Sequence, residues 1–439
     1  MSPAFFHSTA TNRLICVMLF LLAIRCLDSS AYRAASAPGG LFGIDFAPAY
    51  SAAARLNGGR PLYIPEDNSA TPLYQFVSSP LIPMLLRPIA RLSPDNATRI
   101  WALINVLLLT LAVFLFCVAT RIRPLDQPVP VLLMLFTGFR FWPTTVELGI
   151  GNSDIVILFL ASAMFVCARS QRWFLFAFFI ALGALTKTWM IGSLFYLIVR
   201  RQWAAAFAAA GFFAGIGALL FAAVGWGELP VLWRLTHLYS AQPLIVSNSV
   251  VGIAHLYFRA NGIITPLIDN PALCTVVVAA GYGLLVAGLA AIWLRAPRMD
   301  EWELNVSLGL TLMALILGCP VSHQYYYVLA LPLIWLLLNP PDTGRGRLLP
   351  CVAFIIYLAL SVPSPSLNPV PAADQHGIRS LGVGVTFFAG LSLWTFGLFT
   401  VVRGLWAPSA ETGMDSAPAT RDNPIPDPGL SPGAVPASK

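Results

Sequence analysis

The chain has 439 residues, of which 57% are hydrophobic and only 10% are charged, and its mean hydropathy is +0.75. A soluble domain carries roughly 25% charged residues, so this composition excludes a globule of this size surrounded by water. We expect lipid to cover most of the surface, with no separate soluble catalytic domain. The formal charge of +7 does not indicate a nucleic-acid partner, because the arginines recur in pairs at the ends of apolar runs.

Repeated apolar runs with short polar breaks predict an all-α integral membrane protein of about 12 transmembrane helices. The first run follows Arg13 and fits either an uncleaved helix or a signal peptide, and the many later spans favour the helix. The predicted spans are Leu14–Leu27, Ala97–Thr120, Val129–Thr144, Ser153–Ala168, Trp173–Thr186, Thr188–Val199, Trp203–Val224, Ala272–Leu294, Leu304–Cys319, Tyr325–Leu338, Leu348–Val362 and Leu381–Val402.

Three segments fall outside these spans. A long first loop, Asp28–Asn96, contains the apolar, Pro-rich stretch Ser79–Leu92, which suits an interfacial helix better than a span. A second large loop runs over Gly225–Pro271. Residues 1–405 are predicted to form one polytopic domain, and the Pro-, Ser- and Asp-rich residues 406–439 a disordered cytoplasmic tail.

Arginines at the ends of the predicted spans set the orientation. With the N-terminus in the cytoplasm, the cytoplasmic turns hold most of them, and the short outer turns hold very few. The long first loop also carries arginines, but long translocated segments largely escape this rule. The arginines assigned to the cytoplasm are Arg121, Arg123, Arg169, Arg172, Arg200, Arg201, Arg295, Arg298, Arg345, Arg347 and Arg403.

The segment Trp173–Val199 fits either one long helix or two short helices joined at Lys187. One helix would bury a lysine near the bilayer centre, at a cost of roughly 2.5–3.5 kcal/mol. It would also reverse every later span and send the later arginines outside. We therefore predict two short passes, with Lys187 at the outer surface.

This topology gathers the unusual polar residues on the outer face, although they are far apart in the sequence. Glu147 and Asn152 fall in the turn before the fourth predicted span, and His323 follows the ninth. We take this convergence as the main indication of function. The residues concerned are Asp45, Glu147, Asn152, Lys187, Asn248, Ser249 and His323.

Lys187 and Lys439 are the only two lysines, against 24 arginines. A lone lysine between apolar segments suits a compact point charge that binds a phosphate. The alternative is a snorkelling side chain that marks a helix end. We favour the phosphate hypothesis.

Two further residues each allow more than one interpretation. Asp45 suits a base that abstracts a proton at the water–lipid boundary, and it equally suits a helix N-cap before Ala47–Arg55. His323 suits a general base, a phosphate partner or a satisfied interfacial histidine. The tyrosine run Tyr325–Tyr327 fits an interfacial belt better than a sugar-stacking surface. We find no nucleotide-binding loop and no metal-ligand pattern, and we expect no cofactor.

Short motifs follow one another in a fixed order along the chain: Asp45-Phe46 with Tyr50, Asn57-Gly58-Gly59-Arg60-Pro61-Leu62-Tyr63, Tyr74 with Pro80-Leu81 and Arg87-Pro88, Gly149-Ile150-Gly151-Asn152, Gly183-Ala184-Leu185-Thr186-Lys187, Ser247-Asn248-Ser249 and Pro320-Val321-Ser322-His323. This series, within roughly Leu14 to Leu338, resembles glycosyltransferase family 87. Two positions depart from the family pattern: Ile150 replaces a glutamine, and His255 stands where an arginine often follows the Asn-Ser pair.

The resemblance implies a GT-C-type enzyme that moves a hexose, mannose at the family level, from a polyprenyl-phosphate donor to a lipid or glycan acceptor with inversion. It implies two catalytic residues: Asp45 as the base for the acceptor hydroxyl, and His323, which lies near the reaction centre and can share or take over the base role. It also implies that Lys187 holds the donor phosphate. Donor binding is assigned to Lys187 with Asn152, Asn248, Ser249, Glu147 and Tyr63. The expected location is the plasma (inner) membrane, with the active site facing the periplasm.

Two other functions compete with this one. A lipid or sugar transporter or flippase often has about 12 spans, but it typically shows internal repeats and polar residues at the midplane. The sequence shows neither. A protein of this family that has lost activity and serves as a binding partner is the other alternative.

Overall fold

The computed structural model describes residues 43–64, 76–123, 126–241, 247–260, 265–340, 348–363 and 384–403. The predicted first span, Leu14–Leu27, lies outside these residues, as does the predicted tail over 406–439. The described helices belong to one compact unit, Met1–Val402. The described residues form helices and no strand, which confirms the predicted all-α fold.

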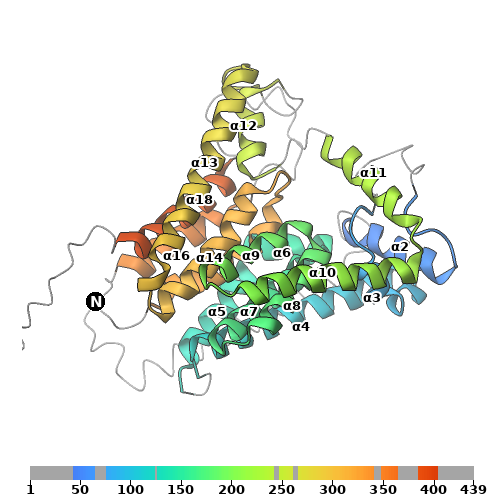
Figure 1. Cartoon of the computed structure of the whole chain (residues 1–439), viewed down its shortest axis with the longest axis horizontal. Helices are drawn as coiled ribbons and strands as arrows, with labels where there is room; N and C mark the ends of the chain where they lie inside the picture. Colours follow the sequence, from blue (N-terminus) through green and yellow to red (C-terminus); the bar gives the residue numbers. More distant parts are fainter. Residues whose placement is uncertain are drawn as a thin grey trace, which may run out of the picture. The chain divides into compact units, whose positions relative to one another are not determined.

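The described helices follow one another along the chain as Figure 1 shows. They are α2 (Phe46–Asn57), α3 (Leu81–Leu86), η4 (Ile89–Arg91), α4 (Pro94–Thr120), α5 (Pro128–Arg140), α6 (Trp142–Ile150), α7 (Asp154–Arg169), α8 (Trp173–Thr186), η5 (Thr188–Ser193), α9 (Leu194–Val199), α10 (Trp203–Val224), α11 (Glu228–Ala241), α12 (Val250–Phe258), α13 (Pro271–Arg295), η6 (Ala296–Arg298), α14 (Glu301–Gly318), η7 (Gln324–Ala330), α15 (Leu331–Leu338), α16 (Leu348–Leu360) and α18 (Val385–Val402).

Four of the described helical segments are long and apolar enough to cross a membrane: α4, α10, Pro271–Arg298 and α18. A fifth candidate is the pair α5 and α6, which bends by 56° at its break. Others are apolar but short, such as α8 with 14 residues. A helix of this length rises about 21 Å, less than the roughly 30 Å of a bilayer core. The chain is a multi-pass membrane protein, and the number of about 12 spans stays a prediction.

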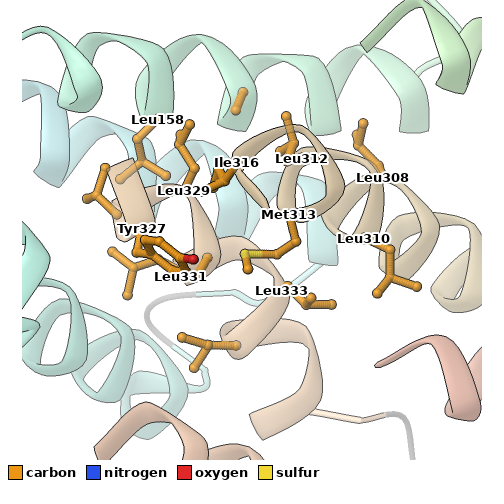
Figure 2. Close-up of a cluster of buried hydrophobic side chains, with 14 of the residues drawn as sticks. Leu158, Leu308, Leu310, Leu312, Met313, Ile316, Tyr327, Leu329, Leu331 and Leu333 are labelled. Carbon is orange, nitrogen blue, oxygen red and sulfur yellow. The ribbon is translucent and has the colours of Figure 1, made fainter. Parts of the chain in front are cut away.

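Helices α4, α7, α8 and α10 lie side by side along most of their length (Figure 1). Beside them, α14 is buried on nearly every side, as expected of a helix that is apolar all round. Its leucines pack against side chains of η7 and α15, including Tyr327, Leu329 and Leu333 (Figure 2). This core holds η7 and the turn before it in a fixed position. That turn carries His323.

The chain reverses direction at Lys187, as the sequence predicts. Lys187 ends α8 in an extended conformation, with φ −139° and ψ 111°, and η5 and α9 then return along the bundle. The return is complete at Arg200, whose guanidinium lies 5.2 Å from the centre of the Trp173 ring at the start of α8. Lys187 and Arg200 therefore mark opposite ends of the same helices.

The end that carries Arg200 is rich in arginines from several helices, and we call it the arginine end. Glu301, at the start of α14, lies 3.5 Å from Arg121 of α4 and 3.9 Å from Arg169 of α7. Arg295 of α13 lies 3.8 Å from Glu303. The helices thus share one polarity, with arginines at this end and the polar residues singled out by the sequence at the other.

Two sequence predictions about loops were wrong. Glu147 lies in helix α6 and not in a turn, because Pro143 ends the preceding helix and begins a new one. The predicted loop Gly225–Pro271 contains the helices α11 and α12. Ser249 starts α12 by accepting a hydrogen bond from the Gly252 N–H at 3.2 Å.

Candidate functional site

Asp45 stands at the N-cap position of α2, but its carboxylate does not cap the helix. The carboxylate instead accepts a hydrogen bond from the Asn152 amide, with 2.8 Å between Nδ2 and Oδ2. The backbone of the loop is fixed as well, since the Asp45 N–H donates to the Ile150 carbonyl at 3.0 Å and Gly43 N–H to the Gly149 carbonyl at 2.8 Å. Asp45 thus stands at the N-cap position without capping the helix, and its role as a base stays a prediction.

Gly151 makes the approach of these two segments possible. Its φ of +74° lies in the left-handed region, which favours glycine. A Cβ at this position would come within 2.9 Å of the Cβ of Phe46. The Gly151 carbonyl also accepts a hydrogen bond from the Trp101 indole at 2.8 Å. A side chain at position 151 would push the Asp45 loop away from Asn152.

Lys187 forms an ion pair with Asp154, with 2.8 Å between Nζ and Oδ2. The Asp154 side chain is fully buried and that of Lys187 is 10% exposed. The ammonium also lies 3.6 Å from the centre of the Tyr326 ring, at a distance typical of a cation–π contact. This arrangement places the ammonium between a carboxylate and an aromatic face, unlike a snorkelling side chain in lipid.

Glu147 shapes the start of α7, which begins at Asp154. Its Oε1 accepts the backbone N–H of Asp154 at 2.6 Å and so supplies the cap that Ser153 does not provide. The second oxygen, Oε2, is buried without a hydrogen-bond partner in the described part of the chain, and so is Oδ1 of Asp154. Two buried carboxyl groups therefore lie next to each other, and Lys187 pairs with one of them, that of Asp154.

His323 lies against the same tyrosines. Its ring stacks on Tyr325, with 5.1 Å between ring centres, and meets Tyr326 edge to face at 5.7 Å. The Tyr325 hydroxyl donates to the Asp45 carboxylate. Burial lowers the pKa of His323 to about 4; the Lys187 ammonium adds to this shift and the Asp45 carboxylate opposes it. At neutral pH the imidazole is therefore uncharged.

Asn248 and Ser249 belong to a segment that holds the His323 turn in position. The Asn248 N–H donates to the Ser322 carbonyl at 2.5 Å, and the Asn248 carbonyl accepts the Tyr327 hydroxyl at 2.6 Å. The Ser249 hydroxyl lies 2.8 Å from that of Ser247, which in turn accepts the Ser322 N–H at 2.8 Å. These contacts hold the turn in place from residues about 75 positions away.

Tyr63 lies apart from these groups. It is buried, its hydroxyl donates to the Ser78 carbonyl at 2.6 Å, and its N–H donates to Glu228 of α11 at 3.0 Å. Its ring stacks on Phe76 at 6.0 Å between centres. The structure thus brings together the predicted residues from α2, α6, α8 and η7, and it places Tyr63 in a separate cluster that joins the first loop to α11.

The sequence interpretation missed Asp154 and undervalued the tyrosines. Asp154 is an ionisable residue within a predicted apolar span, and such a residue by itself indicates a functional site with a charged partner. Tyr325 and Tyr326 contact Asp45, Lys187 and His323, so an interfacial belt does not describe them. We call the whole group the polar site: Asp45, Glu147, Asn152, Asp154, Lys187, His323, Tyr325 and Tyr326.

Within the described ranges, no group of three or more His, Cys, Asp or Glu residues is arranged to hold a metal ion. The polar site instead combines a carboxylate, an ammonium group and a neutral imidazole at the ends of apolar helices. Converging ionisable groups of this kind are candidates for proton transfer and for binding an anion.

The chain belongs to glycosyltransferase family 87: the model of that family matches residues 76–318, more than half of the chain. The family resemblance seen in the sequence is thereby confirmed, and the protein is a membrane glycosyltransferase. The chain is also similar to an alpha-(1->3)-arabinofuranosyltransferase of Corynebacterium glutamicum. The two are 24% identical over 390 residues, which cover 84% of this chain and 85% of the relative.

Proposed function

We propose that this protein transfers a sugar, with inversion, from a polyprenyl-phosphate donor to a lipid or glycan acceptor at the periplasmic face of the plasma membrane. The observation that carries the proposal is the short segment Asn152–Asp154, which contacts both a carboxylate and an ammonium group. Asn152 binds Asp45, and Asp154, two residues further on, binds Lys187. A base for the acceptor and a cation for the donor phosphate are thus held by one turn.

In this proposal Asp45 is the general base. The acceptor hydroxyl loses its proton to Asp45 as its oxygen bonds to the anomeric carbon of the donor sugar. Asn152 and Tyr325 both donate to the Asp45 carboxylate and orient it. His323, with its pKa lowered to about 4, is a weak base and suits a neutral hydrogen-bonding group beside the reacting atoms.

Lys187 is proposed to bind the phosphate of the donor. The bond between the anomeric carbon and the phosphate oxygen breaks in the same step, and the electron pair leaves with the polyprenyl phosphate. The ammonium stabilises the charge that develops on this leaving group. A polyprenyl tail stays in lipid while its phosphate reaches the helix ends, so neither a nucleotide nor a resident metal is required.

The remaining predicted donor-binding residues take supporting roles in this proposal. Asn152 contributes by orienting Asp45, and Glu147 by fixing the start of α7. Asn248 and Ser249 hold the His323 turn. Tyr63 acts at a distance, by fixing the first loop against α11.

Two sugars are candidates for the transferred unit. The family resemblance favours a hexose, namely mannose. The relative from Corynebacterium glutamicum is named for arabinofuranose transfer, and its similarity extends over most of both chains. This relative makes a pentofuranose the second candidate.

The test is a transfer assay with the purified protein in liposomes. Radiolabelled polyprenyl-phosphate mannose and polyprenyl-phosphate arabinofuranose are supplied separately, together with a membrane lipid extract as acceptor source. We expect a labelled product with one of the two donors and none with the Lys187→Ala variant. Movement of the donor across the bilayer without any product would support a flippase and contradict the transferase.

A further inference from the structure

Lys187 does not present an unpaired charge to an arriving phosphate. Its ammonium is already neutralised by Asp154 at 2.8 Å, and the pair is almost completely withdrawn from solvent. The ammonium is also held by the face of Tyr326 at 3.6 Å from the ring centre. Any anion that binds Lys187 must therefore share the ammonium with Asp154 or take its place.

The surroundings of Asp154 make its loss of Lys187 unfavourable. Its backbone N–H is fixed by Glu147, and one oxygen of each of these two carboxyl groups is buried without a hydrogen-bond partner among the described residues. Asp45, held by Asn152 two positions before Asp154, adds another negative charge nearby. A buried carboxylate that loses its cation in such a setting is strongly destabilised.

We propose that Asp154 is the resting counter-ion of Lys187, and that the phosphate of the lipid substrate competes with Asp154 for the ammonium in every catalytic cycle. This inference rests on the proposed function. When the phosphate is bound, Asp154 is left beside Glu147 without its cation. The return of Asp154 to Lys187 then favours release of the polyprenyl phosphate product, so Asp154 is a positioning residue that limits how tightly the product is held.

The test replaces Asp154 by asparagine, which keeps the shape of the side chain but cannot neutralise Lys187. We expect the Asp154→Asn variant to bind a soluble short-chain polyprenyl phosphate about tenfold more tightly than the wild type, within the usual range for coupled binding. We also expect kcat to fall by a similar factor while KM for the donor falls with it, because product release becomes slower. Inorganic phosphate, measured in parallel, shows whether the lipid part is needed for the effect.

A merely structural role for Asp154 predicts the opposite pattern. If Asp154 only orients Lys187, Asp154→Asn weakens binding of the polyprenyl phosphate and turnover together, and the competition hypothesis is overturned. Unchanged affinity overturns it as well. If the asparagine variant does not fold, Asp154→Ser, which is neutral and smaller, serves for the same comparison.

A double variant controls for the buried charge. Asp154→Asn with Lys187→Met removes both members of the pair, so it leaves no unpaired charge, and we expect it to fold and to bind no polyprenyl phosphate. Tight binding by this double variant would contradict the role of Lys187.

Failure of the inference is distinguishable from failure of the proposed function. A wild type that binds the lipid phosphate, without tighter binding in Asp154→Asn, contradicts only the inference. A wild type that neither binds it nor transfers sugar contradicts both.

Discussion

The two ends of the helical bundle use ion pairs in different ways. At the arginine end, Arg121 and Glu301 lie 3.5 Å apart with side chains 69% and 56% exposed. At the polar site, Lys187 and Asp154 lie 2.8 Å apart and are nearly buried. Exposed pairs typically contribute about 0–1 kcal/mol, whereas a buried pair needs compensation for its lost hydration. The arginine end also holds one largely buried pair, Arg295 and Glu303, but their charged atoms lie 3.8 Å apart. The close contact of 2.8 Å between buried charges lies where the chemistry is proposed.

The largest expected effect is the loss of the Asp45 carboxylate. Asp45→Asn keeps the size of the side chain but removes the proposed base, so we expect sugar transfer to fall by about 10²–10⁴-fold. The measurement is the initial rate of product formation with saturating donor. Asp126→Asn is the matched control, because Asp126 pairs with Arg123 near the arginine end and is mostly exposed. Equal losses in both variants would contradict the difference between the two ends.

The next effect concerns the contact that joins Asp45 to Asn152. Gly151→Ala places a Cβ at a positive φ and close to Phe46, so we expect a loss of stability of about 1–3 kcal/mol and at least a tenfold lower rate. Thermal unfolding in detergent and the transfer assay measure the two. Gly149→Ala is the control two residues earlier, because a Cβ there meets nothing within 4 Å. If both alanine variants behave alike, the close approach at Gly151 is not what holds Asp45.

The third prediction concerns pH and His323. The imidazole is neutral in the folded protein because burial lowers its pKa from 6.5 to about 4, with Lys187 adding to the shift and Asp45 opposing it. The unfolded chain therefore binds more protons between these values, so stability falls as pH decreases from about 6.5 toward 4. Between pH 7 and pH 5 the expected loss is about 2 kcal/mol.

Thermal unfolding at several pH values measures this loss, and His323→Gln should reduce the pH dependence. His237→Gln is the matched control, because His237 is exposed on α11 and lies outside the polar site. A wild-type slope that His323→Gln does not change would show that other groups cause the pH dependence.

Apolar runs predict the helical fold, because helices that cross lipid must be apolar. Paired arginines predict which ends of the helices lie together, because arginines gather on one side of a membrane. Lys187 was found because it is a rare residue at a break. Asp154 was missed because it is the first residue of an apolar helix, and its importance depends on a partner 33 positions away. The break at Pro143 was missed for a similar reason: apolarity continues across it, and only the backbone changes direction.

The smallest expected effect lies at the arginine end. Glu301→Gln removes the carboxylate that contacts both Arg121 and Arg169, but the Glu301 side chain is 56% exposed and water screens its charge. We expect the stability to change by at most about 1 kcal/mol and the transfer rate to stay the same. Thermal unfolding at low and high salt measures this contribution, which should shrink as salt increases. A change larger than that of Gly151→Ala would mean that the arginine end also depends on a specific charge arrangement, and the contrast with the polar site would be lost.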